Sequence, residues 1–412
     1  MVELVAERGY NAVSVAQLAK CARVSKRDFY KLFAGKEECF LATYDLVVNR
    51  SLRDLLVVTE GGGDWREQLR LGFLAFAGQI AESPDAARLA LVEVFAAGAV
   101  AVERMQRTNQ LFETLMGGAL AEGSTSLPRL LVKGIVAGCG RLARLRLLSG
   151  RPQDLARDGD QLVEWVLSLC DDDAVHLRGL SGAGVPPRSA AAEAPLGEVP
   201  PGDERALILA ATARLARREG YATLTVPRLR AAAGVSRRSF DTHFAGVADC
   251  FLTTLGMLSR RTLSTAEPSF LTADTWAGGV HRMITDLSRR LALDPVFADL
   301  AFLEVFSPDP EVIRWRSEMI VKLATMLRRE APAERRPTMF AAEASVGAMW
   351  GVIHHFVAAG RAMHLPTAAP VLSYIALAPV LGGSTAVNAI VAEAGGGIET
   401  SSRRRLPRAV PG

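Results

Sequence analysis

The chain contains an internal repeat. When the sequence is shifted by 211 residues, positions 9–52 align with 220–263 without a gap, and 18 of these 44 positions are identical. The same shift pairs landmarks further along: Trp65 with Trp276, Pro84 with Pro295, and Glu93-Val94-Phe95 with Glu304-Val305-Phe306. Near the end of the repeat the register changes by one, and Gly150-Arg151 matches Gly360-Arg361. Self-similarity over this length predicts two tandem units of one architecture.

Composition favours helices for both units. Apolar residues make up 49% of the 412 residues and aromatic residues only 6%, and no long run alternates Val, Ile or Thr with polar residues. This composition predicts an all-α globular protein with enough apolar residues for two cores. The net charge of +4 is small for this length, so it indicates no class of partner by itself.

The first helix of the repeated segment is clearest in the second copy. Asp203 can cap a helix that runs to residue 219 and stops at Gly220, a residue suited to the left-handed position after a helix. The first copy begins at Met1, which aligns with Thr212. We therefore expect the first copy to hold only the last two turns of this helix. Either the start of the chain is misassigned or the first copy is truncated.

Two further short helices follow in each copy. Ser14 and Gln17 form an S-x-x-Q capping box at the start of one helix, and Thr225 holds the matching place. After a turn of three to four residues, the next helix begins at Ser25 and at Ser236. Two short helices joined by such a turn form a helix-turn-helix.

The last of these helices carries an apolar face and a polar face. The apolar face holds Phe29 and Phe33 in copy one and Phe240 and Phe244 in copy two. The outer face holds Lys26, Arg27, Tyr30 and Lys31 in copy one, and Arg237, Arg238, Asp241 and Thr242 in copy two. Such a helix fits the major groove of DNA, where Lys or Arg donates to guanine and Thr meets a thymine methyl group. A single basic cluster is often only solvated, but its presence in both copies favours DNA.

These segments resemble the DNA-binding domain of the TetR family of regulators. The shared pattern is G-Y-x-x-x-[ST]-V-x-x-L-A, then A-x-V-S-[KR], then F-Y-x-x-F-x-x-K-E. Copy one matches at Gly9-Tyr10, Ser14-Val15, Leu18-Ala19, Ala22, Val24-Ser25-Lys26, Phe29-Tyr30, Phe33 and Lys36-Glu37. Copy two matches at Gly220-Tyr221, Thr225-Val226, Leu229, Ala233-Gly234-Val235-Ser236, Phe240 and His243-Phe244.

The resemblance implies a transcriptional regulator whose three-helix heads bind double-stranded DNA. A larger helical bundle would bind an unknown small-molecule effector and dimerise, and the usual role is that of a repressor. Two copies in one chain predict an internal pseudo-dimer that holds the heads about 34–36 Å apart, and a further homodimer stays open. The expected DNA-binding residues are Ser14, Arg23, Ser25, Lys26, Arg27, Tyr30, Lys31 and Lys36 in the first head and Thr225, Ser236, Arg237, Arg238, Thr242 and His243 in the second.

Three departures from the family pattern distinguish the heads. Arg23 replaces the usual glycine of the turn, at a cost of about 1 kcal/mol if its φ is positive. In copy two, Asp241 replaces the phosphate-binding tyrosine and Val247 replaces the lysine that begins the fourth helix. We therefore expect the second head to bind more weakly or to read a different half-site, so that the operator would be asymmetric.

The expected domain order follows from the repeat and from changes in composition. Residues 173–202 are rich in Gly, Pro and Ala and predict a linker, and residues 395–412 predict a disordered basic tail. The predicted domains are a head at 1–53 with a truncated first helix, a bundle at 54–172, the linker, a second head at 203–264, a second bundle at 265–394, and the tail.

The bundles offer weaker candidates for a ligand site. Trp165, Trp350, His354 and His355 lie on helices expected to form a dimer interface or pocket walls, and such side chains are more often core or interface residues than ligand contacts. Adjacent histidines point about 100° apart on a helix, and no carboxylate or cysteine completes a metal set. We expect no metal and no cofactor.

Further features bear on location. The five cysteines are scattered without C-x-x-C spacing, which predicts neither a disulfide framework nor a zinc site and suits a reducing cytoplasm. The start of the chain does not have the pattern of a signal peptide. Residues 365–392 carry no charge, but prolines interrupt them, so we expect buried helices and no membrane partner.

An enzyme and a scaffold protein are the two alternatives to a regulator. The sequence has no P-loop, no G-x-S-x-G and no H-E-x-x-H, which argues against an enzyme. The alternative is a scaffold or interaction protein in which one or both heads no longer bind DNA. Asp241 and Val247 favour that alternative for the second head.

Overall fold

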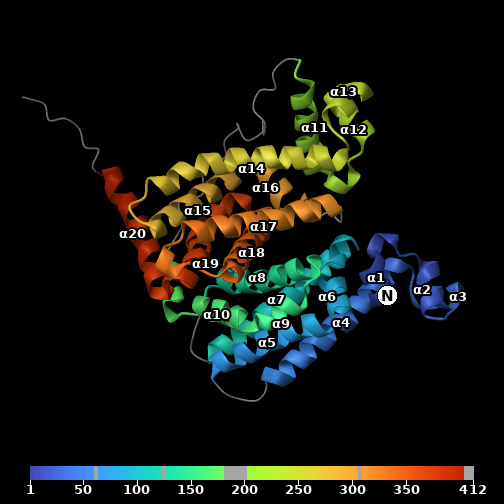
Figure 1. The fold of residues 1–412 in the computed structure, drawn as a ribbon, viewed down its shortest axis with the longest axis horizontal. Helices are drawn as coiled ribbons and strands as arrows, with labels where there is room; N and C mark the ends of the chain where they lie inside the picture. Colours follow the sequence, from blue (N-terminus) through green and yellow to red (C-terminus); the bar gives the residue numbers. More distant parts are fainter. Residues whose placement is uncertain (60–63, 123–126, 181–201, 305–308, 403–412) are drawn as a thin grey trace, which may run out of the picture.

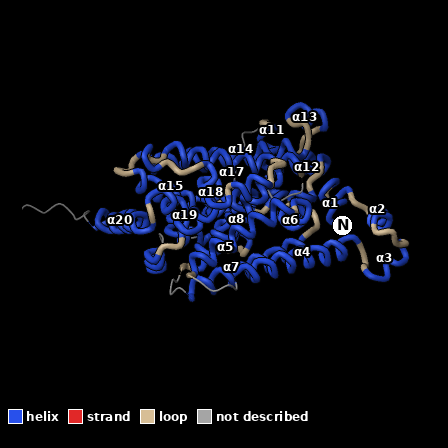
Figure 2. Tube along the Cα trace, turned by 60° about the horizontal axis from the view of Figure 1, so that its bottom comes forward, coloured by secondary structure: helices blue, strands red, loops and turns tan. Residues whose placement is uncertain are grey.

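A computed structural model describes residues 1–59, 64–122, 127–180, 202–304 and 309–402. Every element within these ranges is an α-helix or a short 3-10 helix, which confirms the all-α prediction (Figure 1). The heads at α1–α3 and α11–α13 both lie toward the end of the molecule opposite α20 (Figures 1 and 2).

The elements of the first half begin with the head and continue into its bundle. They are α1 (Val2–Arg8), η1 (Tyr10–Ala12), α2 (Val15–Cys21), α3 (Lys26–Leu32), α4 (Lys36–Thr59), α5 (Trp65–Glu82), α6 (Pro84–Leu91), η2 (Glu93–Phe95), α7 (Ala99–Glu122), α8 (Arg129–Leu148), α9 (Gln153–Arg157), α10 (Gly159–Leu169) and η3 (Asp172–Gly179).

The second half repeats this order. It consists of α11 (Glu204–Glu219), η5 (Tyr221–Thr223), α12 (Val226–Ala233), α13 (Arg237–His243), α14 (Val247–Leu271), α15 (Trp276–Leu293), α16 (Pro295–Phe302), α17 (Pro310–Glu330), η7 (Ala333–Arg335), α18 (Met339–Ala358), η8 (Ala362–Ala368), α19 (Ala369–Leu381) and α20 (Gly383–Ser402). Thus α8 corresponds to α18, and α7 corresponds to α17.

Side-chain caps begin the short helices of both heads at the predicted residues. Ser14 and Gln17 form the capping box of α2, and the Thr225 hydroxyl accepts the Arg228 N–H at the start of α12. Ser25 accepts the Asp28 N–H at 3.0 Å to begin α3. Each cap satisfies a backbone donor that would otherwise have no partner within the helix.

The prediction for Gly220 needs a correction. Its φ is +86°, as a residue in the left-handed position would have, but its ψ is 149°. Gly9 ends α1 in the same way, with φ +76° and ψ 151°. The chain leaves each helix in an extended direction, because the next backbone N–H is bound by a carboxylate of the bundle and not by the helix itself.

The core is divided unequally between the halves. One apolar cluster joins the first bundle, the second head and the second bundle, from Trp65 to Ile390. The first head has a separate cluster, in which Phe29, Phe40 and Tyr44 pack with Leu89 and other residues of α6, η2 and α7. The second head is therefore part of the main core, whereas the first head packs mainly on its own half.

Helices α8 and α18 pack side by side in the middle of the molecule (Figures 1 and 2). Small residues permit this close approach. A Cβ atom added to Gly138 would lie 3.0 Å from the Ala344 carbonyl oxygen, and one added to Gly351 would overlap the Ala137 Cβ. Close contact between these backbones therefore requires glycine at both positions.

The contacts of α8 with α18 recur in reciprocal pairs. When the two helices are aligned end to end, Ala137 matches Gly347 and Arg141 matches Gly351. Gly351 lies against Ala137, and Gly347 lies against Arg141, with its added Cβ 3.3 Å from the Arg141 Cβ. An isologous contact between two identical subunits has this form, in which residue i meets residue j of the partner and j meets i.

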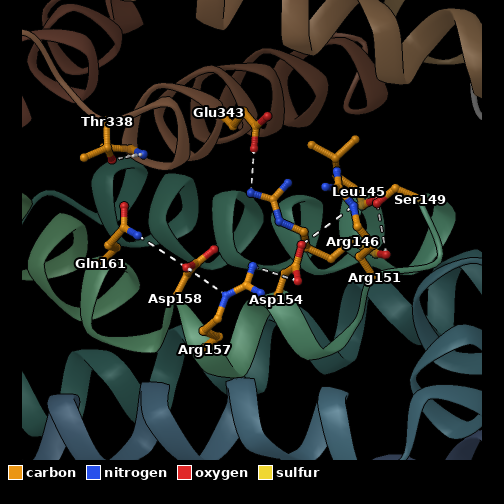
Figure 3. A network of polar contacts seen from close by, with 11 residues as sticks. Leu145, Arg146, Ser149, Arg151, Asp154, Arg157, Asp158, Gln161, Thr338 and Glu343 are labelled. Atoms are coloured by element: carbon orange, nitrogen blue, oxygen red, sulfur yellow. Dashed lines mark hydrogen bonds and ion pairs between the residues drawn. The ribbon is translucent and has the colours of Figure 1, made fainter.

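Polar contacts also cross between the halves. Arg146 of α8 pairs with Glu343 of α18 at 2.9 Å, and both side chains are nearly buried (Figure 3). The Trp165 Nε1–H donates to the Ser345 hydroxyl at 3.0 Å. On the α9 side of the same network, Arg157 pairs with Asp154 at 2.8 Å.

The structure differs from the predicted boundaries at two places. Residues 172–179, at the start of the predicted linker, form η3, and Ala174 and Leu177 are buried against the second bundle. Most of the predicted linker, 181–201, lies outside the described residues. Helix α20 continues to Ser402, past the predicted end of the bundle at 394, and the remainder of the predicted tail also lies outside the described residues.

One stretch within the described ranges, Ala362–Leu381, is long and apolar enough to cross a membrane by length and composition. It contains η8 and α19, and 78% of its most apolar 18-residue segment is buried within the fold. Residues such as Tyr374 and Leu377 are fully covered by other helices. This stretch therefore forms core helices, in agreement with the sequence-based expectation.

Candidate nucleic-acid interface

Helix α3 presents the predicted basic face to solvent. Phe29 is buried and packs against Phe33 with ring centroids 5.5 Å apart, which orients the rest of the helix outward. Lys26 and Arg27 are exposed and form no ion pair with any described residue. The Tyr30 side chain is 56% exposed, so its hydroxyl is accessible to a phosphate. The positive charges of Lys26 and Arg27 are thus available to a partner.

Not all of the basic residues near α3 are equally available. Lys31 pairs with Asp28 at 2.6 Å. The Lys36 ammonium donates to the Tyr10 carbonyl oxygen at 2.9 Å and lies 4.1 Å from the centre of the Tyr10 ring. Burial also lowers the pKa of Lys36. The geometry therefore gives Lys36 a role in joining α4 to η1, in addition to the DNA contact expected from the sequence.

The turn before α3 contains the one non-glycine residue with a positive φ among the described residues. Arg23 has a φ of +56°, and its counterpart Gly234 has a φ of +69°. Arg23 is exposed, as are the two cap residues Ser14 and Ser25, whose hydroxyls are bound to their own helix ends. The arginine therefore occupies a glycine position with its guanidinium in solvent.

Helix α13 of the second head carries less free positive charge. Arg237 and Asp241 form an ion pair at 3.4 Å along the helix. Arg238 is exposed and forms no ion pair within the described ranges. The Thr242 hydroxyl donates to the Arg238 carbonyl oxygen at 2.7 Å, and His243 is exposed beside Phe244. Ser236 and Thr225 cap α13 and α12.

The basic residues on α12 are half-buried and make contacts within the protein. Arg228 pairs with Glu219 and donates to the Thr223 carbonyl oxygen at 2.7 Å. The Arg230 Nε is buried. The sequence counts four basic residues between 228 and 238, but Arg228 is neutralised within the head. Local charge in the sequence therefore overstates the charge that the second head presents.

Comparison with known proteins agrees with this geometry. The profile described as "Bacterial regulatory proteins, tetR family" matches residues 2–43 and again 208–253, which are the two heads. The chain is a TetR-family protein with two tandem heads. It is therefore a DNA-binding regulator of the TetR type, and members of that family are regulators and not enzymes.

Further comparisons add little to this TetR-family assignment. A solved structure, the fatty acid degradation regulator FadR from Bacillus halodurans, aligns with 17% identity and a TM-score of 0.39. The alignment covers 43% of this chain and 96% of that chain. No curated protein matches this chain significantly.

Two equivalent contacts of this TetR-family protein were missed by the sequence analysis. The Glu93 carboxylate accepts the Tyr10 N–H at 2.9 Å, and the Glu304 carboxylate accepts the Tyr221 N–H at 2.6 Å. The two bonds are equivalent in the repeat, and each joins a head to the end of the α6 or α16 region of its bundle. We call them the head latches. The paired Glu-Val-Phe motifs were the only signal for them in the sequence.

The four bundle candidates lie between the halves or close to the interface. Trp165 is buried and bonded to Ser345 across the halves, so it belongs to the interface. Trp350 is buried against Phe302, with ring centroids 4.9 Å apart. The His354 Nδ1–H donates to the Phe302 carbonyl oxygen at 2.7 Å, whereas His355 lies beside Arg361.

The described residues show no metal centre, and Cys39 and Cys250 are not activated thiols. They contain no group of three or more His, Cys, Asp or Glu side chains that could hold a metal ion. Burial raises the pKa of Cys39 and raises that of Cys250 to about 11, so both thiols stay protonated at neutral pH.

Proposed function

We propose that this TetR-family protein is a repressor that reads an asymmetric operator with two unequal heads. The observation that carries the proposal is the difference between α3 and α13. Lys26 and Arg27 are exposed without an ion pair among the described residues, whereas Arg237 is neutralised by Asp241. An acidic side chain on a groove-facing helix repels phosphate, so the first head would supply most of the binding free energy.

We infer further that one chain takes the place of the usual dimer. The reciprocal contacts of α8 and α18, including the pairs Ala137 with Gly351 and Arg141 with Gly347, support this. The Trp165–Ser345 and Arg146–Glu343 contacts add to the same interface. A shared interface would hold the heads at a fixed separation, as reading of two half-sites requires.

Operator affinity of single variants tests the proposal. DNA fragments retained by the purified full chain would first be sequenced, and binding to one of them would then be measured by gel retardation at several salt concentrations. Arg27→Ala should weaken binding by about 10- to 100-fold, since a contact to a base edge contributes about 1–3 kcal/mol. Arg238→Ala should weaken it by less than about threefold.

The control variant is Arg157→Ala, which removes an exposed arginine of the first bundle. It should leave the affinity unchanged. Equal losses for Arg27→Ala and Arg238→Ala on a palindromic site would contradict the asymmetry. Binding that does not weaken steeply with salt would favour the second candidate function, a scaffold whose heads no longer bind DNA; the Arg237–Asp241 pair is the observation that favours it.

A further inference from the structure

The pairing of α8 with α18 is reciprocal in position but not in chemistry. Helix α8 begins at Arg129 and α18 at Met339, so equivalent positions of the two helices differ by 210 residues. Each contact from one half to the other therefore has a mirror contact, in which the two halves exchange roles. Between identical subunits, a contact and its mirror are made by the same residues. In this chain several of them are made by residues of different types.

The first difference is a buried ion pair. Arg146 of α8 pairs with Glu343 of α18 at 2.9 Å, and the two side chains are 11% and 8% exposed (Figure 3). The mirror positions are Lys133 of α8 and Phe356 of α18. Phe356 is buried, and Lys133 pairs with Glu113 of its own half at 2.8 Å. An apolar side chain thus occupies the place that mirrors Arg146.

The second difference is a buried hydrogen bond. Trp165 of α10 is buried, and its Nε1–H donates to the Ser345 hydroxyl of α18 at 3.0 Å. The mirror positions are Ile375 of α19 and Ile135 of α8, and both isoleucines are fully buried. Trp165 therefore finds its acceptor in the second half, because the equivalent of Ser345 in its own half is an isoleucine.

The third difference is in the space between the helices. Gly351 of α18 lies so close to α8 that an added Cβ would overlap the Ala137 Cβ. The equivalent of Gly351 on α8 is Arg141. A first half in the place of the second would bring the Arg141 Cβ against Ala137, and such an overlap forces the backbones apart.

Two first halves would pair poorly in this geometry. Arg146 would face Lys133 of the other copy, so that two cations would meet in a largely buried place. Arg141 would in addition overlap Ala137. Each unfavourable contact would occur twice, because such a pairing is symmetric.

Two second halves would pair poorly for another reason. Glu343 would face Phe356 of the other copy, so two carboxylates would be buried without the cation that Arg146 supplies. A buried ion pair that loses one partner is strongly destabilised, because the remaining charge has been removed from water without compensation. The chemistry of the interface therefore favours one half of each kind.

We propose that the α8–α18 surface is selective for an unlike half, so that a first half accepts a second half and rejects a copy of itself. Arg146, Glu343 and Gly351 set this choice. The inference rests on the pairing within one chain that forms part of the proposed function. Its consequence is that every assembled regulator carries one head of each kind. Two heads of the more basic first type are never combined, and the unequal reading of an operator is fixed by the pairing of the bundles.

Native mass spectrometry of a cut chain tests the selectivity in the absence of DNA. A site for a specific protease would be inserted between residues 190 and 191, and the folded full chain would be cut there. The fragments would exchange in mild denaturant, which would then be removed. Because the two fragments differ in mass, like and unlike pairs are counted separately. Unlike pairs should outnumber like pairs by about 100-fold or more, since each like pair leaves buried charges opposed or uncompensated.

A double variant separates selectivity from stability. Arg146→Met/Glu343→Leu replaces the buried ion pair by apolar side chains, a change that is often neutral for stability, so its Tm should stay within about 3 °C of the wild type. Second halves should nevertheless pair with each other at least about tenfold more often. Pairs of first halves should remain rare, because Arg141 still meets Ala137. The control Arg157→Ala, which changes an exposed side chain of α9, should pair like the wild type.

Equal numbers of like and unlike pairs in the wild type would overturn the proposal, as would a double variant that pairs as selectively as the wild type. If the cut chain does not reassociate, thermal unfolding of the intact chain decides. Arg146→Met and Glu343→Leu should each lower the Tm by at least about 5 °C, and the double variant should recover most of that loss. Losses that simply add would also overturn the proposal.

The result is independent of operator binding. A failed gel retardation with the selective pairing intact would count against the regulator and not against the selectivity of the interface.

Discussion

Arg23 occupies a backbone conformation that its side chain disfavours. With φ at +56°, an L-residue costs about 1–2 kcal/mol relative to the right-handed region, whereas its counterpart Gly234 has no Cβ to clash. An exposed arginine retained at such a place is consistent with a contact to phosphate. Backbone strain often occurs at turns that contact a ligand, and the positive φ of Arg23 fits such a turn.

Replacing Arg23 by glycine should therefore stabilise the protein and weaken operator binding. We expect the free energy of unfolding of Arg23→Gly to rise by up to about 1 kcal/mol in denaturant titrations, with DNA affinity reduced. The matched change in the second head, Gly234→Ala, should destabilise by about 1 kcal/mol, because it introduces a Cβ at positive φ. A less stable Arg23→Gly protein would contradict this account of the turn.

His354 is a buried residue whose charge state couples folding to pH. Its pKa is about 4 in the folded protein, against about 6.5 in an unfolded chain. Between these values the unfolded chain binds more protons, so the free energy of unfolding falls as pH falls from 6.5 toward 4. This loss should amount to roughly 2–3 kcal/mol and should be reduced in His354→Asn, whose amide can still donate to the Phe302 carbonyl oxygen.

The measurement is denaturant unfolding at several pH values for the wild type and the variant. His364→Asn is the control, since His364 is exposed, and it should keep the full pH dependence. A residual slope will remain in His354→Asn, because burial also lowers the pKa of His281 and His355. Identical slopes for wild type and His354→Asn would refute the assignment.

At the scale of elements, the head latches connect each helix-turn-helix to its bundle. The carboxylates of Glu93 and Glu304 hold the Tyr10 and Tyr221 N–H groups at the point where α1 and α11 end. Their bundles contact the heads through α6 on α1 and α16 on α11. A shift of these bundle helices would therefore reach the heads through a direct hydrogen bond.

Removing one latch should loosen only its own head. In Glu93→Ala the amide of Tyr10 should exchange with solvent at least about tenfold faster, because losing an acceptor for a buried donor costs about 1–3 kcal/mol. Exchange at Tyr221 should not change. Glu304→Ala should show the converse, so each variant is the control for the other in hydrogen-exchange measurements. Equal loosening of both heads would indicate global destabilisation instead.

At the scale of the whole molecule, the pairing of α8 with α18 unites the two halves. Gly351 lies so close to Ala137 that a side chain of one carbon would overlap it, whereas Gly140 of α8 has open space around its Cα. Both glycines lie within a helix, and they differ in whether a neighbouring helix fills the space next to the Cα atom.

Gly351→Ala should therefore destabilise the whole chain by about 1–3 kcal/mol, the usual cost of overpacking. Gly140→Ala should be neutral or stabilising by up to about 1 kcal/mol, since alanine favours a helix. Denaturant unfolding monitored by both tryptophan fluorescence and circular dichroism would show this. If Gly351→Ala proved as stable as Gly140→Ala, the close approach of the two helices would be in doubt.

Local patterns in the sequence were sufficient for the two heads. Caps such as Ser14 and Ser25 and the spacing of Phe29 among basic residues depend on contacts within a few residues, so they predicted the short helices. The positive φ of Arg23 was only a condition in the sequence analysis, and the structure shows it. The extended end of α11 at Gly220 was not predictable in this way, because Glu304 causes it from 83 residues away along the chain.

Sequence alone therefore determined the helical class, the duplication and the TetR-type heads, since short-range hydrogen bonding and periodicity encode them. Tertiary structure decided which charges face solvent. Arg228 is neutralised by Glu219, while Arg316 of α17 comes close to Arg141 and Arg144 of α8 in the interior. Coulomb energy depends on distance and burial, and neither can be read from sequence spacing once contacts span two halves of a chain.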